Sequence, residues 1–188
     1  MTPEFAAPND DARPIWLVQK DLHDNLPPPM QTWVKVTGFA GKASGSCPLP
    51  KWEGTIGGAL IGVEKPSDRP SRERFALAKA ALALPEGAWK VENWPEGVDR
   101  AEAAFGWLLA QYAFGRYRKA EGAKARLVAP EGVDAARLLA MAEAEFLTRD
   151  LINTPANDMG PDALEAAARD MAAKHGFAVK VVTGEELL

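Results

Sequence analysis

Residues 88–129 read AWKVENWPEGVDRAEAAFGWLLAQYAFGRYRKAEGAKARLVA, and this stretch decides the fold class. Ala88–Val91 is a short, largely apolar run between turn residues, which predicts a strand. Ala101–Tyr117 carries apolar side chains at helical spacing and predicts a helix, and Ala125–Ala129 predicts a second strand. The expected buried stripe of that helix is Ala104, Trp107, Leu108, Gln111, Tyr112 and Gly115. A strand, a helix and a strand in this order indicate an α/β fold.

The residues before this stretch extend the same pattern. Short β-branched or aromatic runs predict strands at Ile15–Gln19, Thr32–Val36 and Ile56–Val63. We expect the prolines 27–29 to exclude a regular helix between the first two strands. The third run contains Gly57, Gly58 and Gly62, which indicate a bulge or a close approach of another backbone segment. A helix is predicted from an N-cap at Ser71, with Glu73 in its first turn and Phe75, Ala78 and Leu82 on its apolar face.

The carboxy-terminal third predicts a break between two domains. A long helix at Asp134–Leu151 is followed by a turn over residues 153–161, which contains two prolines and a glycine. A second helix is predicted at Pro161–His175, then a strand at Phe177–Val182 and a helix starting near Thr183. Residues 131–188 hold 11 acids and 5 bases, whereas residues 1–130 hold 15 acids and 17 bases, which supports a boundary near this turn.

The expected fold class is therefore α/β, with a mixed, largely parallel sheet flanked by helices. We expect residues 1–152 to form an amino-terminal α/β domain that ends in a linker helix over residues 134–152. Residues 153–188 are expected to contribute the first helix and strand of a second, truncated α/β domain.

Composition narrows the function classes. The chain has 188 residues, 47% of them hydrophobic and 26% charged, with a formal net charge of −4. This charge argues against binding to nucleic acid or to an anionic membrane through bulk electrostatics. Residues 1–14 carry acids and no basic stretch before an apolar run, so we expect no secretory signal, and no run approaches the roughly 18 apolar residues of a membrane span. A single cysteine, Cys47, excludes an intramolecular disulfide and favours a reducing compartment such as the cytosol.

The residues that could carry catalysis or bind metal are few and scattered. His23, Cys47 and His175 show no metal-ligand spacing, and we interpret them as surface or loop residues. Cys47 would need a neighbouring base to act as a nucleophile, so we expect an incidental thiol in a loop. Gly38–Gly45 lacks the spacing of a phosphate-binding loop and predicts a turn between strands.

Charged residues give no complete active site either. Five cations lie within eleven residues against Glu121, close to aromatic side chains: Arg116, Arg118, Lys119, Lys124 and Arg126. Such a patch could hold phosphates or nucleic acid, but a solvated helix end favoured by the helix dipole explains it more simply. The carboxylate pairs Glu143 with Glu145 and Asp158 with Asp162 are not specific for acid–base catalysis.

A family resemblance enters at residues 149–161, which read RDLINTPANDMGP. The run Asn153, Thr154, Pro155, Ala156 and Asn157, between a long helix and one that starts with proline, resembles the segment that opens the catalytic domain of leucine (cytosol) aminopeptidases. Gly106–Tyr117 looks like the helix that precedes this segment in the family. Phe177–Leu188 is similar to the part of the family's catalytic domain that comes next. We interpret the Asn153–Asn157 run as a structural motif of the family.

The resemblance implies an aminopeptidase that removes amino-terminal residues from peptides and is cytoplasmic and usually hexameric. It also implies two divalent metal ions, zinc or manganese, which activate a bridging water and polarise the scissile carbonyl. The family's metal ligands and catalytic residues lie in an Asn-Thr-Asp-Ala-Glu-Gly-Arg motif and a Lys- and Asp-rich stretch, and this sequence contains neither. No catalytic residue, metal ligand or bound metal is therefore expected in this chain. The expected partners are peptide substrates, through the catalytic domain, and further copies of the chain, with no membrane and no nucleic acid.

These observations leave two hypotheses. In the first, the chain is the amino-terminal part of a metallo-aminopeptidase and is inactive by itself. In the second, it is a stand-alone, non-catalytic binding or assembly module with the same fold, using the patch between Arg116 and Arg126.

Overall fold

The computed structural model describes residues 2–8, 11–19, 26–42, 45–51, 53–64 and 75–187. The chain forms two compact units, Met1–Phe146 and Leu147–Leu188. The boundary between the two units falls within helix α4 (Ala135–Asn153). The predicted start of a second domain at residue 153 stays a prediction.

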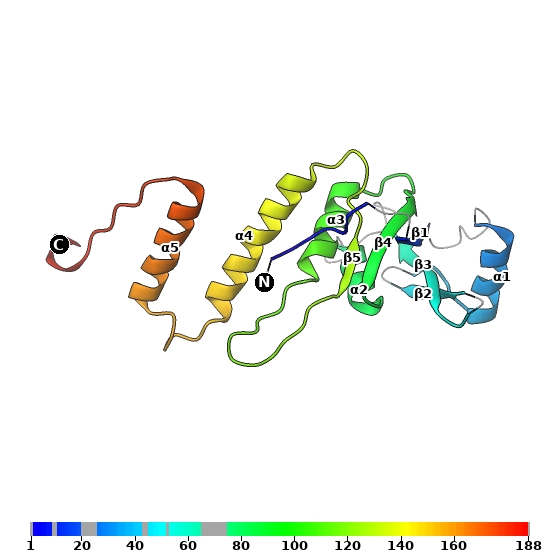
Figure 1. The fold of residues 1–188 in the computed structure, drawn as a ribbon, viewed down its shortest axis with the longest axis horizontal. Coiled ribbons are helices and arrows are strands. Elements are labelled where there is room, and N and C mark those ends of the chain that lie inside the picture. The colour runs from blue at the N-terminus through cyan, green and yellow to red at the C-terminus, as the bar shows by residue number, and fades with distance from the viewer. Residues whose placement is uncertain are drawn as a thin grey trace. The chain divides into compact units, whose positions relative to one another are not determined.

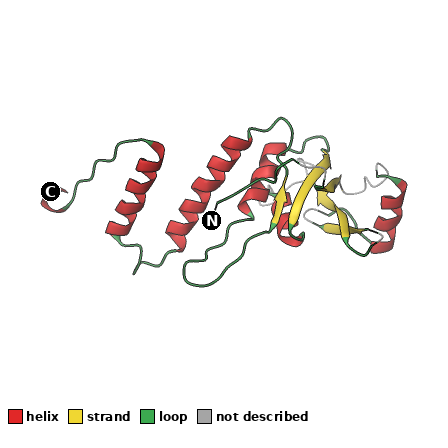
Figure 2. Ribbon diagram, in the orientation of Figure 1, coloured by secondary structure: helices red, strands yellow, loops and turns green. Residues whose placement is uncertain are grey.

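The first unit is built on a five-stranded sheet with the order β2-β3-β1-β4-β5 (Figures 1 and 2). Its strands are β1 (Arg13–Gln19), β2 (Ser46–Pro50), β3 (Ile56–Val63), β4 (Gly87–Asn93) and β5 (Ala125–Leu127). β1 pairs in parallel with β3 and β4, β4 pairs in parallel with β5, and β2 is antiparallel to β3. The sheet is therefore mixed and largely parallel, which confirms the predicted fold class.

Helices cover both faces of the sheet. Successive side chains of a strand point to opposite faces, so Leu17 and Ile61 join the larger core while Val18 and Leu60 join the smaller one. The larger core contains side chains from α2 (Ala76–Ala83), α3 (Arg100–Leu109) and α4. The smaller core contains Val34 from α1 (Pro28–Thr37), so α1 packs on the opposite face.

Helix α1 corrects two predictions, because residues 32–36 are helical and the preceding prolines start the helix instead of excluding it. Pro27 is the N-cap, and prolines occupy the first two helical positions. The backbone N–H groups of those two positions have no partner inside a helix, so proline costs nothing there. Gly38 then ends the helix in the left-handed conformation, with φ of 65°.

Strand β2 was not predicted, since Pro48 and Pro50 argue against a strand. β2 lies at the edge of the sheet, where a missing N–H is tolerated. The indole of Trp33 on α1 donates a hydrogen bond of 3.0 Å to the carbonyl of Pro48. Cys47 therefore lies in an edge strand, and its predicted loop position is wrong.

The glycines of β3 permit a close backbone approach, as predicted. A Cβ on Gly62 would overlap the backbone of Lys42 in the segment between α1 and β2. In that arrangement the Gly62 N–H donates to the carbonyl of Gly45 at 2.8 Å. The connection thus adds a hydrogen bond to β3 that no larger residue at position 62 would allow.

Helix α2 begins later than predicted, after a Phe75 N-cap with no side-chain cap hydrogen bond. Ser71 and Glu73, the predicted N-cap and first-turn acid, lie outside the described residues. β4 and β5 coincide with two predicted strands to within two residues at each end.

Helix α3 ends eight residues before the predicted end at Tyr117. The N–H groups of Gln111 and Tyr112 donate to carbonyls three residues back, which tightens the last turn. The carbonyl of Ala110, which a continuing helix would offer to Phe114, instead accepts the N–H of Ala123 at 2.9 Å. The predicted stripe is correct as far as Gln111, which is 1% exposed.

The amino-terminal segment covers the free edge of β5. Ala6 forms a parallel bridge to Val128 and donates its N–H to Leu127 at 2.8 Å. The Gln111 side chain binds the backbone of Glu4 through two hydrogen bonds, of 3.0 and 2.9 Å. Residues more than 100 positions apart thus close this edge of the sheet.

The second unit contains the end of α4, helix α5 (Pro161–His175) and a 3-10 helix, η4 (Gly184–Leu187). α5 has the predicted bounds, and Gly176 ends it with φ of 73°. The strand predicted at Phe177–Val182 is wrong, since residues 177–183 belong to neither helix nor strand. A strand needs a partner, and the described residues of this unit contain none. No helix in the described part of the chain is long and apolar enough to cross a membrane.

Candidate functional site

The described residues contain no cluster of side chains that could bind a metal ion. Within the described ranges, no three His, Cys, Asp or Glu side chains gather closely enough to hold a metal ion. His175 is exposed at the end of α5, and His23 lies outside the described residues. The described residues therefore do not fit the metal pair that the family resemblance implies, and no hydrolytic step is assigned to them.

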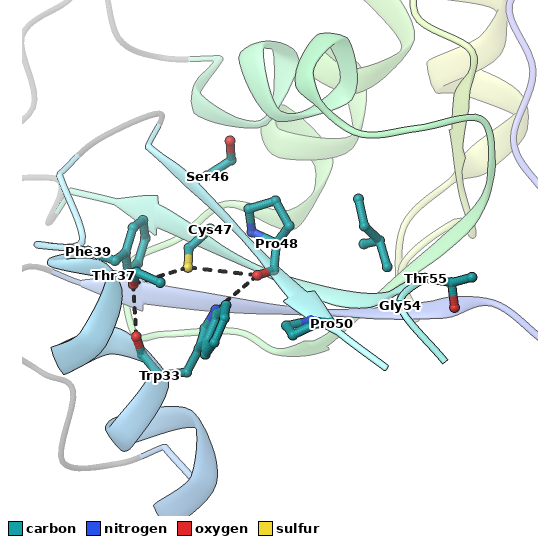
Figure 3. A pocket seen from close by; sticks show the side chains of 10 residues that line it. Trp33, Thr37, Phe39, Ser46, Cys47, Pro48, Pro50, Gly54 and Thr55 are labelled. Carbon is teal, nitrogen blue, oxygen red and sulfur yellow. Dashed lines mark hydrogen bonds between the residues drawn. The ribbon is translucent and has the colours of Figure 1, made fainter. Parts of the chain in front are cut away.

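A pocket of about 430 Å³ lies between α1 and β2 (Figure 3). The rings of Trp33 and Phe39 and the prolines of β2 form apolar parts of its lining, and hydroxyl groups come from Thr37, Ser46 and Thr55. The volume is in the range of small-molecule sites. None of the described residues that line it carries a charge.

Cys47 lies in this pocket and is 5% exposed. Its Sγ is 3.5 Å from the Thr37 hydroxyl and 3.9 Å from the Pro48 carbonyl oxygen, as Figure 3 shows. A nucleophilic cysteine needs a base or a cation that stabilises its thiolate. The described pocket lining offers neither, so the geometry favours a packed thiol over a catalytic one.

The segment Gly38–Gly45 joins helix α1 to strand β2. The predicted turn between two strands is therefore wrong, because a helix precedes it. Gly38 caps α1, and Gly45 donates its N–H to the carbonyl of Lys42 at 2.9 Å. Residues 43 and 44 lie outside the described residues. A phosphate-binding loop is followed directly by a helix, whereas this segment is followed by strand β2.

The predicted basic patch lies in the loop between α3 and β5, except for Arg126, which lies in β5, and not at a helix end. Glu121 binds Lys124 at 2.8 Å and Lys119 at 3.1 Å. Hydrogen bonds from Lys124 and then Lys119, with the charge of Lys124, lower the pKa of Glu121. The hydrogen bond between Lys124 and Glu121, together with the negative charge of Glu121, raises the pKa of Lys124. The dipole explanation of this patch is therefore wrong, because α3 ends at Leu109.

Arg126 belongs to a separate ion pair. Its Nε lies 2.6 Å from a carboxylate oxygen of Glu4, in the amino-terminal segment. Two of the five patch cations, Lys124 and Arg126, thus help to hold local structure. The other three lie nearer the tip of the loop.

The family motif at residues 153–157 forms the turn between α4 and α5. Asn153 ends α4, and the buried Thr154 donates its hydroxyl to the carbonyl of Asp150 at 2.7 Å. The carbonyl of Pro155 accepts the N–H groups of Asp158 and Met159, both at 2.9 Å. Pro155, Ala156 and Asn157 are exposed.

The predicted carboxylate pairs supply no acid–base site in the described structure. Glu143 and Glu145 lie on α4 two positions apart, where side chains diverge. Asp158 and Asp162 are exposed on either side of the start of α5. Sequence reasoning did not single out the Gln111 contact with Glu4, because no local pattern pairs residues so far apart.

Comparison with known proteins agrees with this architecture. Residues 13–130 match the family model for the N-terminal domain of M17 aminopeptidases. A probable cytosol aminopeptidase of Streptomyces coelicolor is 33% identical over 144 residues, which cover 63% of this chain and 26% of the relative. A probable cytosol aminopeptidase of Oleidesulfovibrio alaskensis is 52% identical over 42 residues, which cover 22% of this chain and 8% of the relative.

Solved structures extend the similarity to the second unit. The crystal structure of a cytosol aminopeptidase from Coxiella burnetii matches 96% of this chain and 40% of its own, with a TM-score of 0.80 and 28% identity. The bottromycin maturation enzyme BotP, solved in complex with Mn, shares the fold at 22% identity and a TM-score of 0.74, over 94% of this chain and 39% of its own. This chain thus spans less than half the length of these relatives. Since the family model covers well over half of the sequence, the chain belongs to the M17 aminopeptidase family, and residues 13–130 are its N-terminal domain.

Proposed function

We propose that this chain is the amino-terminal part of a leucyl aminopeptidase-like metallo-exopeptidase that hydrolyses amino-terminal residues from peptides. The observation that carries the proposal is the match of residues 13–130 to the M17 N-terminal domain, in a chain that spans 40% or less of the relatives described above. In the proposed enzyme, a catalytic domain supplies the chemistry, and this chain supplies the N-terminal domain and the start of the catalytic domain.

The 188-residue chain alone is proposed to be inactive. Hydrolysis of a peptide bond by a protein needs a water activated by metal ions or by a general base, or a nucleophile with its base. In the described part of the chain, the candidate nucleophile Cys47 is buried beside Thr37, and no acidic, basic or histidine side chain lines its pocket. The two divalent ions, Zn or Mn, are proposed to bind to residues of the catalytic domain.

The second unit is proposed to begin that catalytic domain. Ile152 is 76% exposed and Leu187 69% exposed, and Leu164 and Phe177 are also exposed apolar side chains. Covering these side chains with the rest of a catalytic domain would remove their apolar surface from water, which is favourable. Residues 177–182, which form no strand here, are proposed to pair with strands of that domain.

The remaining parts of the proposal rest on the named relatives. We place the enzyme in the cytosol, where the names of the cytosol aminopeptidases put those proteins. Peptides are its proposed substrates, and a homo-oligomer, a hexamer, is its proposed assembly.

A turnover assay tests the inactive-fragment proposal. The purified 188-residue chain is incubated with leucine p-nitroanilide and either manganese or zinc. No p-nitroaniline release is expected above a metal-only control. Turnover by the unchanged chain would overturn the proposal. Equal turnover by a Cys47→Ala variant would in addition exclude Cys47 as the nucleophile.

The intact mass of the natural protein separates the two hypotheses. A mass more than twice the 20.2 kDa of this chain is expected for the enzyme. A mass near 20.2 kDa would instead favour a stand-alone binding or assembly module with the same fold.

A further inference from the structure

Contacts within the chain hold the walls of the pocket between α1 and β2 in place. The Trp33 indole is fixed to β2 by its 3.0 Å hydrogen bond to the Pro48 carbonyl. The Thr37 hydroxyl donates to the Trp33 carbonyl, which is 2.9 Å away and one turn earlier in α1. The rings of Trp33 and Phe39, which Figure 3 shows, pack against the buried side chains of the smaller core. A site that is formed in advance binds its ligand without the cost of ordering these side chains.

The volume of the pocket sets the size of a ligand. A volume of about 430 Å³ is about three times the roughly 150 Å³ of a protein cavity that holds benzene. A molecule of one or two fused rings therefore fits, with room for small substituents. The lining residues Ser46 and Thr55 are exposed, so a ligand can enter from solvent without unfolding of the sheet.

The side chains that line the pocket favour an uncharged aromatic ligand. Because none of the described lining residues is charged, an ion that leaves water for this pocket loses its hydration and gains no opposite charge. The rings of Trp33 and Phe39 can stack on another ring or meet its edge, and aromatic pairs in these arrangements are favourable beyond the area that they bury.

The Thr37 hydroxyl in the pocket is placed to accept a hydrogen bond. Its proton is used by the backbone of α1, since its oxygen lies 2.9 Å from the Trp33 carbonyl oxygen and 3.3 Å from that of Val34. A hydroxyl oxygen has two lone pairs. The Cys47 thiol, 3.5 Å away, can occupy one of them. An N–H or O–H group of a ligand can donate to the other.

We propose that this pocket binds a small uncharged aromatic molecule with one hydrogen-bond donor, of the indole or phenol class. The rings of Trp33 and Phe39 contact the ligand, and Thr37 accepts its hydrogen bond. The bound molecule also covers the Cys47 thiol. All of these residues belong to the N-terminal domain, whereas the proposed hydrolysis belongs to the catalytic domain. The inference therefore goes beyond the proposed function, and its failure would leave that function unaffected.

A protein that inserts a side chain is the less favoured occupant. The turn between β2 and β3, which borders the pocket, carries Lys51 and Glu53, and both are exposed. The central part of a protein interface is depleted of charged residues. A small molecule inside the pocket does not need to cover these two charges. Docking of a protein is therefore an outcome that would overturn the proposal.

The experiment is a titration of the nitrogen-15-labelled 188-residue chain with indole, followed by NMR. The indole N–H resonance of Trp33, assigned with a Trp33→Phe variant, should shift in a saturable way, with a Kd of about 1 mM or lower. Indole-3-carboxylate carries a negative charge on the same rings and should bind about tenfold more weakly or worse. Equal binding of these two probes would overturn the proposal.

The hydrogen bond to Thr37 has a test of its own. N-methylindole lacks the donor and should bind about threefold to tenfold more weakly than indole. In a Thr37→Val variant, this preference should disappear, because valine has a similar shape and no acceptor. A preference that is unchanged in the folded variant would overturn the assignment of Thr37.

Two phenylalanine variants form a matched pair, with circular dichroism to verify folding. Phe39→Ala removes a ring from the pocket and should weaken indole binding by about fivefold or more. Phe177→Ala removes a ring that is 49% exposed in the second unit and should leave binding unchanged. Equal binding by the two folded variants would show that indole binds to exposed apolar side chains in general, which overturns the proposal.

Alkylation of Cys47 by iodoacetamide gives a second measure of occupancy. The chain has a single cysteine, so mass spectrometry reports this site directly. Indole should slow the reaction, whereas indole-3-carboxylate at the same concentration should not. The absence of both a saturable Trp33 shift and this protection overturns the proposal. A Trp33 shift that depends on protein concentration without indole assigns the pocket to another protein chain instead.

Discussion

The side-chain amide of Gln111 binds the backbone of Glu4 in both directions. Its oxygen accepts the Glu4 N–H at 3.0 Å, and its nitrogen donates to the Glu4 carbonyl at 2.9 Å. Gln111 is 1% exposed, so its amide depends on these bonds to replace water. The contact fixes the amino-terminal segment beside the last turn of α3.

Replacing Gln111→Leu is expected to lower the free energy of unfolding by about 1–3 kcal/mol, because it leaves the two backbone groups of Glu4 without partners. Chemical denaturation monitored by tryptophan fluorescence measures the loss. Glu4→Ala is the matched control, since it removes only the exposed carboxylate that pairs with Arg126 and keeps the backbone. Its effect should stay below about 1 kcal/mol. Equal losses in the two variants would show that the amide does not hold the segment.

Replacing Gly122→Ala should destabilise the chain by about 1–3 kcal/mol, because the added methyl overlaps the backbone of Gln111. Gly115→Ala in the same loop is the control, since its nearest neighbour, the Arg118 carbonyl oxygen, is 4.0 Å away. That change should stay within about 0.5 kcal/mol. Thermal unfolding followed by circular dichroism compares the two, and a tolerated Gly122→Ala would contradict the close approach of Gly122 to the Gln111 backbone.

Thr154→Val is expected to loosen the turn between α4 and α5. The change removes the 2.7 Å hydrogen bond from the Thr154 hydroxyl to the Asp150 carbonyl, at a cost of about 0.5–1.5 kcal/mol. Faster amide hydrogen exchange at residues 150–159 would report this local effect. Asn157→Ala, at an exposed position of the same motif, should leave exchange unchanged.

The pKa of Glu121 should lie below that of an ordinary glutamate, because Lys124 and Lys119 stabilise its carboxylate. A lowered folded-state pKa means that the contribution of Glu121 to stability is present above the unfolded pKa. It is lost as the pH falls through the folded pKa. Lys124→Met should raise the pKa of Glu121 toward its ordinary value, measured by a carbon-13 NMR titration of the side chain. Lys90→Met, at a cation that pairs with Glu92, should not move it.

Periodicity was enough to predict most of the larger elements. The helix started by Pro161 has the predicted bounds because a proline and a glycine mark its two ends, and β3 has them although its glycines weaken the strand signal. Residues 32–36 carry β-branched side chains and yet are helical, since the start at Pro28 and the glycine at position 38 outweigh a weak strand preference. The early end of α3 depends on Ala123, thirteen residues away from Ala110, which no local pattern reports.

Only those functional features whose residues are consecutive in the sequence could be predicted. The Asn153–Asn157 run indicates the family because its residues are consecutive in sequence, and their turn is closed by bonds of short range. The pocket between Trp33 and Cys47 could not be predicted, since it requires α1 to be a helix and residues 46–50 to be a strand. The basic loop was recognised from its charges, but its position outside a helix depends on the tertiary contact that ends α3.

Both borders of the five-stranded sheet offer few free backbone groups, and this has a consequence for how the chain behaves at high concentration. On one side, Pro48 and Pro50 of β2 lack N–H donors and Trp33 uses the Pro48 carbonyl; on the other, Ala6 pairs with Val128. Exposed borders of sheets recruit strands from neighbouring molecules, which leads to domain swapping and amyloid. We therefore expect the sheet of the N-terminal domain to resist edge-to-edge association between copies of the chain.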